Sequence, residues 1–165
     1  MHVLLEKALK DVGDASRCLS WWYCRPDKAL SILTLLHQLE MPEGAERKQY
    51  DLMIGVIMAV TANCYVVKKE PVKAAEFYRK AEQYRKGGRY SSVYARIALK
   101  HNLKDHYQAA LESIEIGIAN HRKLPVFFKL FTCFFYRWWM HPRLWRVPLM
   151  ERLYARRLRN RIMEK

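Results

Sequence analysis

The sequence is poor in the residues that interrupt helices. It holds six glycines and six prolines in 165 residues, and most of them fall between apolar stretches rather than inside them. Because glycine and proline are the strongest helix breakers, this distribution favours helices joined by short turns. The composition is 51% hydrophobic and 13% aromatic, which excludes a disordered chain and a loop-rich disulfide scaffold.

Paired cysteines are also missing. The four cysteines, Cys18, Cys24, Cys64 and Cys133, form no Cys-x-x-Cys pair and stand among apolar or aromatic neighbours, so we expect buried free thiols. The first seven residues lack the basic start and the uninterrupted apolar stretch of a secretory signal. We therefore expect a cytoplasmic protein, with attachment to the periphery of a membrane as an alternative.

The residue types that catalysis needs are present but do not form a recognisable catalytic or metal-binding pattern. Gly87-Gly88 predicts a helix stop and not a glycine-rich phosphate loop, and the six histidines are dispersed without a metal-binding pattern. Glu112 and Glu115 share the polar side of one predicted helix, where nothing would desolvate their carboxylates. We expect no metal, no cofactor and no enzymatic activity.

Positive charge is in excess and unevenly placed. The net charge is +14, of which residues 1–65 carry −1, residues 66–136 carry +8 and residues 137–165 carry +7. Such a distribution indicates an acidic partner: an acidic protein, an anionic membrane surface or a nucleic acid. The aromatic residues follow a helix-core pattern and no familiar nucleic-acid motif is present, which argues against a nucleic-acid partner.

Apolar residues recur at helical spacing along most of the chain. Residues 3–10 and 15–24 form two predicted helical pieces around Gly13, with one bent helix as the alternative, and further helices are predicted over 26–36, 46–67, 72–82, 91–102 and 107–120. Pro71 and Gly87-Gly88 separate the central helices. The pattern predicts an all-α fold of antiparallel helical hairpins.

Residues 91–124 resemble a tetratricopeptide repeat, a helix-turn-helix unit with small residues where its two helices touch. The matching positions are Tyr94, Ile97, Ala98, Tyr107, Ala110, Leu111, Ile114 and Gly117. Residues 55–88 repeat the pattern with Met58, Ala62, Tyr65, Ala74, Tyr78 and Ala81, and residues 10–40 carry a weaker copy. The resemblance implies a right-handed, tetratricopeptide-like solenoid of three stacked hairpins.

In tetratricopeptide proteins the first helices of successive repeats line a groove that holds a peptide or a partner helix. The resemblance places Asn63, Arg96 and Asn102 in that groove, where an asparagine can bond a peptide backbone as donor and acceptor. It implies a non-catalytic protein-protein interaction module: an adaptor, a chaperone or an assembly scaffold.

The segment 124–140 is apolar nearly all round a helix. About fifteen residues span about 22 Å, short of the ~30 Å hydrocarbon core of a bilayer. We expect a helix that caps the last repeat, while insertion into a partner, into a second copy of the chain or into a membrane interface stays open. The chain is predicted to be a single domain, 1–165, with hairpins over 1–124 and an aromatic, basic cap over 125–165.

The last predicted helix has an apolar stripe and a basic side. The stripe comprises Met150, Tyr154, Leu158 and Ile162. Arg152, Arg156 and Arg159 lie opposite, and Trp138, Trp139 and Trp145 precede them. These arginines and tryptophans are candidates for contact with an acidic protein or an anionic membrane, although a solvated terminal helix has the same composition. The alternative function is therefore a peripheral membrane-associated accessory subunit.

Overall fold

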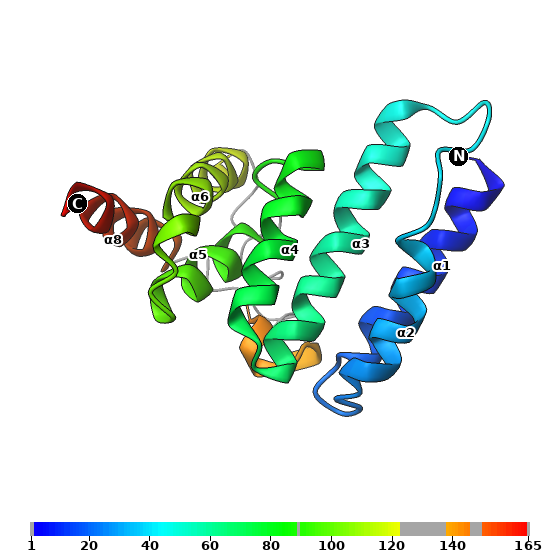
Figure 1. Ribbon diagram of the computed structural model, residues 1–165, viewed down its shortest axis with the longest axis horizontal. Coiled ribbons are helices and arrows are strands. Elements are labelled where there is room, and N and C mark those ends of the chain that lie inside the picture. Colours follow the sequence, from blue (N-terminus) through cyan, green and yellow to red (C-terminus); the bar gives the residue numbers. More distant parts are fainter. Residues whose placement is uncertain (1, 89, 123–137, 146–149, 165) are drawn as a thin grey trace. The chain divides into compact units, whose positions relative to one another are not determined.

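The computed structural model describes residues 2–88, 90–122, 138–145 and 150–164. These residues form α-helices and short 3₁₀ helices and contain no β-strand, which confirms the predicted all-α class (Figure 1). The chain divides into two compact units, Met1–Arg85 and Lys86–Lys165, called unit 1 and unit 2 below. The predicted boundary between residues 124 and 125 lies outside the described residues, and the single domain stays a prediction.

Unit 1 is built from four helices, each antiparallel to the next (Figure 1). They are α1 (Val3–Cys18), α2 (Pro26–Leu36), α3 (Arg47–Lys68) and α4 (Pro71–Tyr84). The first helix is continuous through Gly13, which agrees with the alternative of one helix and not with a division at Gly13. It ends at Cys18, so the predicted extension of the helix to residue 24 is wrong. A single glycine inside a helix costs only about 1 kcal/mol, which the packing of α1 against α2 and α3 offsets.

The third helix is the centre of unit 1. It packs against α1, α2 and α4, and most of its residues from Met53 to Val67 are buried. By length and composition α3 could cross a membrane, but 67% of its apolar window is buried inside the protein, and the core helix of a soluble protein passes the same test. It ends at Lys68, the following residue Lys69 has a φ of +66°, and Pro71 starts α4 at a position where a missing N–H costs nothing.

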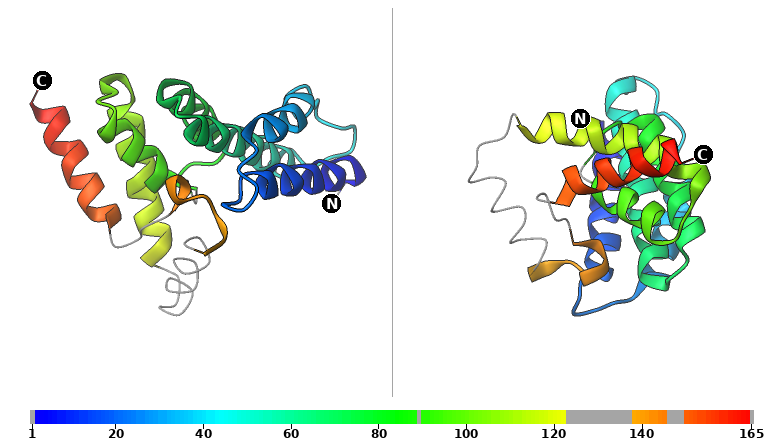
Figure 2. Two further views of the ribbon diagram at one scale, coloured as in Figure 1. Left: turned by 90° about the horizontal axis from the view of Figure 1, so that it is seen from below. Right: turned by 90° about the vertical axis from the view of Figure 1, so that its left-hand side faces the viewer.

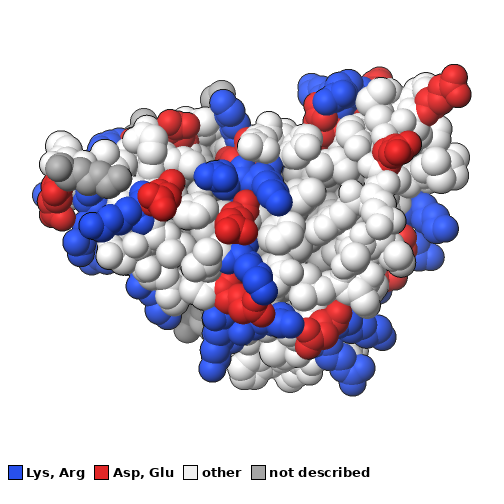
Figure 3. All heavy atoms as spheres, in the orientation of Figure 1, with Lys and Arg blue, Asp and Glu red and all other residues white. Residues whose placement is uncertain are grey.

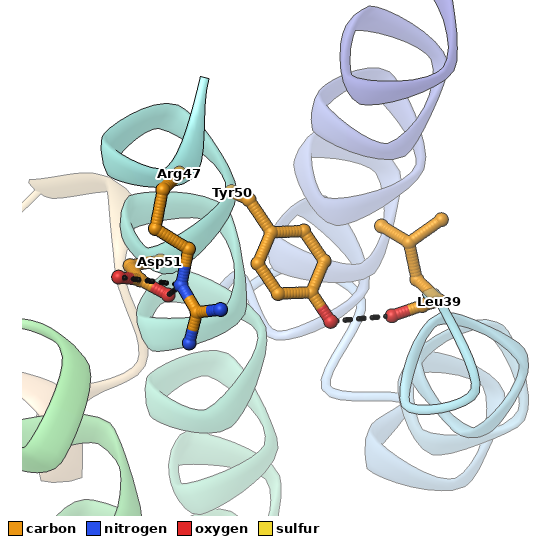
Figure 4. A network of polar contacts seen from close by, with 4 residues as sticks. All are labelled: Leu39, Arg47, Tyr50 and Asp51. Atoms are coloured by element: carbon orange, nitrogen blue, oxygen red, sulfur yellow. Dashed lines mark hydrogen bonds and ion pairs between the residues drawn. The ribbon is translucent and has the colours of Figure 1, made fainter. Parts of the chain in front are cut away.

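Polar contacts fasten the segment between α2 and α3 to the start of α3. The hydroxyl of Tyr50 donates to the main-chain oxygen of Leu39 at 2.8 Å (Figure 4). One turn of α3 is braced by Arg47, whose Nε lies 3.1 Å from Asp51 Oδ1. Deeper in the unit, His37 Nε2 lies 2.9 Å from Thr61 Oγ1. Thr61 Oγ1 also lies 2.9 Å from Ile57 O of its own helix.

Unit 2 begins with a helical hairpin, against which helix α8 packs. The elements of its described residues are α5 (Ser91–Lys100), the 3₁₀ helix η1 (Lys104–His106), α6 (Tyr107–Arg122), the 3₁₀ helix η2 (Pro142–Leu144) and α8 (Glu151–Met163). Helix α8 packs against both α6 and α5, and it lies beside α6 in Figures 1 and 2. The hairpins α3–α4 and α5–α6 form where the repeats were predicted. Their stacking into a right-handed solenoid stays a prediction.

Small residues allow α5 and α6 to come close together. Ala98 and Ala110 have no exposed surface, and a Cβ added to Gly117 would lie 2.5 Å from Ser91 Oγ. The turn between the helices is closed by side chains, since Tyr94 Oη lies 3.0 Å from His106 Nδ1. Tyr94, Ala98, Ala110 and Gly117 are among the positions on which the resemblance to a tetratricopeptide repeat rests.

The cysteines differ in their surroundings. Cys64 is buried as predicted, and burial raises the pKa of its thiol to about 12. Cys18 is half-buried, while Cys24 is exposed with a φ of +43°, so the expectation of a buried thiol is wrong for Cys24. The reason is that α1 ends at Cys18, which leaves Cys24 in the connection to α2. Cys133 lies outside the described residues.

Candidate functional site: a basic groove between α6 and α8

Helix α8 has five arginines exposed to solvent. Its buried positions are Glu151, Ala155 and Leu158, spaced four and three residues apart on one face of the helix. The exposed arginines are Arg152, Arg156, Arg157, Arg159 and Arg161. All three predicted contact residues of this helix, Arg152, Arg156 and Arg159, therefore lie on its open side.

The buried stripe differs from the predicted one. Leu158 is fully buried, but Met150, Tyr154 and Ile162 are only half-buried, and Ala155 takes the central contact. An alanine at the crossing point lets two helices approach more closely than a larger side chain would. Because the buried side of α8 passes through Ala155, its neighbours Arg152 and Arg159 lie next to α6.

A shallow groove of about 360 Å³ runs between α6 and α8. Its lining residues are Glu115, Ile118 and Ala119 from α6 and Arg152, Ala155 and Arg159 from α8. The groove therefore combines apolar side chains with two guanidinium groups that lie two helical turns apart, about 10 Å along the axis. We call this surface the α6–α8 groove.

One carboxylate shares the groove with the arginines. Arg159 Nε lies 2.9 Å from Glu115 Oε1, and the two side chains remain 58% and 41% exposed. An ion pair this open to solvent adds little to stability. Among the described residues, no carboxylate lies within ion-pair distance of Arg152, Arg156 or Arg157. Most of the positive charge of α8 is therefore available to a partner.

The excess charge of the whole chain belongs almost entirely to unit 2. Residues 86–165 hold seventeen Lys and Arg against five Asp and Glu, a net charge of +12, while residues 1–85 hold thirteen against eleven, a net charge of +2. On the face drawn in Figure 3, acidic and basic side chains lie next to one another in many places. The row on α8 differs from such mixed surfaces because its arginines outnumber their carboxylate partners.

Asn63, Arg96 and Asn102 are predicted to line a groove along the first helices of the repeats. In the structure each of them makes hydrogen bonds within its own unit. Asn63 is 1% exposed, and its Oδ1 accepts a hydrogen bond from the hydroxyl of Tyr78 at 2.6 Å. Its side chain is packed between α3 and α4 and does not line an open groove of unit 1. The interpretation of Asn63 as an accessible contact residue therefore needs correction, because the amide is already paired in the core.

Arg96 and Asn102 are more accessible but also hold local structure. The guanidinium of Arg96 donates to the main-chain oxygens of Arg143 and Trp145, the latter at 3.4 Å, and so ties α5 to η2. Asn102 is exposed with a φ of +53°, and its Oδ1 accepts from the hydroxyl of Tyr107 at 2.8 Å. The structure brings neither residue into the α6–α8 groove.

The three predicted tryptophans fall into two groups. Trp138 and Trp139 are 66% and 39% exposed. Trp145 is half-buried, and its Nε1 donates to the main-chain oxygen of Met140 at 2.8 Å, which closes the segment that contains η2. Trp145 is thus a structural residue of this segment.

A second exposed aromatic group lies in the connection between α1 and α2, where the sequence does not predict one. Trp21, Trp22 and Tyr23 are 54%, 65% and 62% exposed. The predicted helix over 15–24 includes all three, and apolar side chains of such a helix are expected to be buried. The signal against that helix was Pro26, because a proline so often marks the first turn of a new helix.

No metal-binding arrangement of three or more His, Cys, Asp or Glu side chains occurs in the part of the chain that the structure describes. Comparison of the chain with family models, with curated proteins and with solved structures gave no significant match. What the α6–α8 groove binds must therefore be inferred from its own chemistry.

Proposed function

We propose that the chain is a non-catalytic protein-protein interaction module that binds an acidic segment of a partner protein in the α6–α8 groove. The observation that supports this most directly is the row of exposed arginines on α8 beside an apolar-lined groove. Guanidinium groups bind carboxylates through two parallel hydrogen bonds, which gives direction as well as attraction.

The spacing of the arginines describes the segment that would fit. Arg152 and Arg156 are one helical turn apart, and Arg152 and Arg159 are two turns apart. An acidic helix laid along α8 would meet them with carboxylates at a spacing of three to four residues. Ile118 and Ala119 would accept an apolar side chain from the same helix, as in other helix-in-groove complexes.

Glu115 makes the two ends of the groove unequal. Its carboxylate is paired with Arg159, so an incoming carboxylate is attracted less strongly at that end than beside Arg152 and Arg156. Such asymmetry favours one direction of the bound segment. The net charge of unit 2 would also speed the encounter with an acidic partner at low ionic strength.

This function is that of an adaptor, a chaperone or an assembly scaffold. The helical hairpins α3–α4 and α5–α6 supply rigid elements for it, and a binding module of this kind needs no cofactor. A cytoplasmic partner protein fits the proposal.

Reversal of the arginine charges tests the proposal. We expect R152E/R156E/R159E to lower the affinity for a Glu-rich amphipathic helical peptide by about tenfold or more, because three charge contacts are lost. Fluorescence anisotropy of the labelled peptide measures this at several salt concentrations. The slope of the affinity against salt should also become smaller.

The matched control carries the same change in net charge at another place. Lys86, Lys100 and Lys104 are exposed in unit 2 and lie outside the groove lining, so K86E/K100E/K104E changes the total charge by the same amount. We expect this variant to bind the peptide within about threefold of the unmodified chain. Equal losses in both variants would mean that only net charge matters and would contradict a specific groove.

A further inference from the structure

The connection between α1 and α2, residues 19–25, is a tight turn; we call it the aromatic loop. Three main-chain hydrogen bonds close it: Arg25 N to Cys18 O at 2.8 Å, Cys24 N to Ser20 O at 2.9 Å and Tyr23 N to Ser20 O at 3.2 Å. Cys24 adopts a φ of +43° to complete the turn. With its main chain held in this way, the loop presents Trp21, Trp22 and Tyr23 to solvent.

The three rings are exposed although burial would be favourable. Trp21 and Trp22 touch edge to face, with ring centroids 5.8 Å apart and planes at 86°. More than half of each of the three side chains faces solvent. Consecutive exposed aromatic residues of this size indicate a contact surface. Indole and phenol rings have an apolar body and a polar edge, which suits the boundary between water and the hydrocarbon of a bilayer.

Positive charge surrounds the aromatic loop. The ion pair of Asp27 with Lys68, at 2.6 Å, joins the start of α2 to the end of α3, so the aromatic loop and the α3–α4 turn lie at the same end of unit 1 (Figure 1). The acidic residues of this end all have basic partners: Asp14 pairs with Arg17, Asp27 with Lys68 and Glu70 with Lys73.

Three further basic residues at this end have no described carboxylate within ion-pair distance. They are Arg25, Lys28 and Lys69, and all three are exposed. A pocket of about 460 Å³ lies next to Tyr23, and Arg17, Arg25 and Lys28 contribute to its lining together with Asp14. The pocket has the size and the predominantly positive charge to accept an anionic headgroup.

We propose that the aromatic loop docks unit 1 on an anionic lipid surface. Trp21, Trp22 and Tyr23 enter the interfacial layer, while Arg25, Lys28 and Lys69 contact phosphate and carboxylate groups of the lipids. Lipid is a better fit than a protein pocket because more than half of each of the three residues faces solvent, and Arg25 and Lys28 line a pocket next to Tyr23 that can hold a headgroup. This surface is distinct from the α6–α8 groove.

Flotation of the intact chain with vesicles tests the proposal. We expect the chain to bind vesicles of phosphatidylcholine with phosphatidylserine and not vesicles of phosphatidylcholine alone. W21S/W22S should weaken binding about tenfold or more, because two large apolar side chains no longer enter the interface. The matched control is L35S, which removes an exposed apolar side chain near the other end of α2.

Quenching by brominated lipids shows which residues enter the bilayer. W138F/W139F retains Trp21, Trp22 and Trp145, and W21F/W22F retains Trp138, Trp139 and Trp145, so Trp145 is common to both variants. We expect bromolipid to quench the fluorescence of the first variant more strongly than that of the second. Circular dichroism confirms that each variant folds.

Three outcomes would overturn the proposal. The first is that the intact chain does not bind phosphatidylserine vesicles. The second is that W21S/W22S and L35S bind them equally well, which would place the contact elsewhere, including on α8. The third is stronger quenching of W21F/W22F. None of these outcomes depends on whether R152E/R156E/R159E still binds the acidic peptide, so the two proposals fail separately.

Discussion

At the scale of single residues, burial separates structural asparagines from contact residues. Asn63 and Asn102 have the same side chain and were predicted to share one role. Asn63 is buried and paired with Tyr78, while Asn102 is exposed and ends α5 in a left-handed conformation. The two positions depend on different properties of asparagine. Asn63 depends on the hydrogen-bonding amide, and Asn102 depends also on the tolerance of asparagine for positive φ.

We expect N63A to reduce stability and to leave binding unchanged. The substitution removes a buried hydrogen bond of 2.6 Å and leaves a cavity, with a cost of about 1–3 kcal/mol in the free energy of unfolding. Urea unfolding measures the loss, and anisotropy with the acidic peptide measures the affinity. Y78F removes the same bond, so the loss in N63A/Y78F should be smaller than the sum of the two single losses.

The opposite pattern would contradict this role of Asn63. If N63A left the free energy of unfolding unchanged but weakened peptide binding, the amide would be a contact residue. The groove implied by the resemblance would then be the binding surface, in place of the α6–α8 groove.

At the scale of helices, apolar periodicity predicted most boundaries. The predicted helix over 26–36 coincides with α2, and those over 46–67, 72–82, 91–102 and 107–120 differ from α3, α4, α5 and α6 by at most two residues at either end. Proline or glycine lies near most of these ends in the sequence, the turn between α5 and α6 being an exception, so local information was largely sufficient.

Two features of the helices could not be read from periodicity. The aromatic loop looked helical because Trp21, Trp22 and Tyr23 continue an apolar pattern, while the turn that exposes them is closed by main-chain hydrogen bonds. The buried side of α8 passes through Ala155 because of its contact with α6, which lies more than thirty residues away in the sequence. Long-range contacts of this kind create the α6–α8 groove, and single-sequence patterns do not contain them.

The hairpin of α5 and α6 allows a test of helix contact. In G117A the new Cβ would lie 2.5 Å from Ser91 Oγ, so we expect the substitution to be destabilising or neutral. In S91A this atom is gone, and the next atoms lie 3.5 Å and 3.8 Å away. Because alanine is the better helix former by about 1 kcal/mol, G117A should stabilise the S91A protein. Thermal and urea unfolding of the unmodified chain, G117A, S91A and S91A/G117A measure whether the effect of G117A on the free energy of unfolding becomes stabilising when Ser91 is replaced.

Ser92 provides the control for this cycle. Like Ser91, it is buried, and its hydroxyl has no hydrogen-bond partner among the described residues. It is not among the atoms closest to Gly117. S92A should therefore leave the effect of G117A unchanged, and an equal reversal in S92A would show that the contact with Ser91 does not limit the approach of the helices.

At the scale of the whole molecule, the chain separates its charge. Unit 2 carries +12 and unit 1 carries +2, although the two units are of similar length. Repulsion among like charges destabilises a compact state, so the positive surface charge of unit 2 lowers its folding stability. Such a loss of stability is expected where binding of an acidic partner neutralises the charge. The two proposed surfaces also suit different partners: an apolar, aromatic loop on unit 1 and a row of arginines on unit 2.

We expect salt to stabilise unit 2 more than unit 1. Raising the ionic strength from about 0.05 M to about 0.5 M screens repulsion over most distances within a unit, and the +12 unit has more repulsion to lose. Hydrogen exchange followed by mass spectrometry measures this, because slowly exchanging amides of α5 and α6 report on unit 2 and those of α3 and α4 report on unit 1. Saturating acidic peptide at low salt should also slow hydrogen exchange in α6 and α8, as raised salt does, since the peptide neutralises the arginines of α8. If salt changed protection equally in both units, repulsion within unit 2 would not be the cause, and the arginines of α8 would have to be explained as a solvated surface instead.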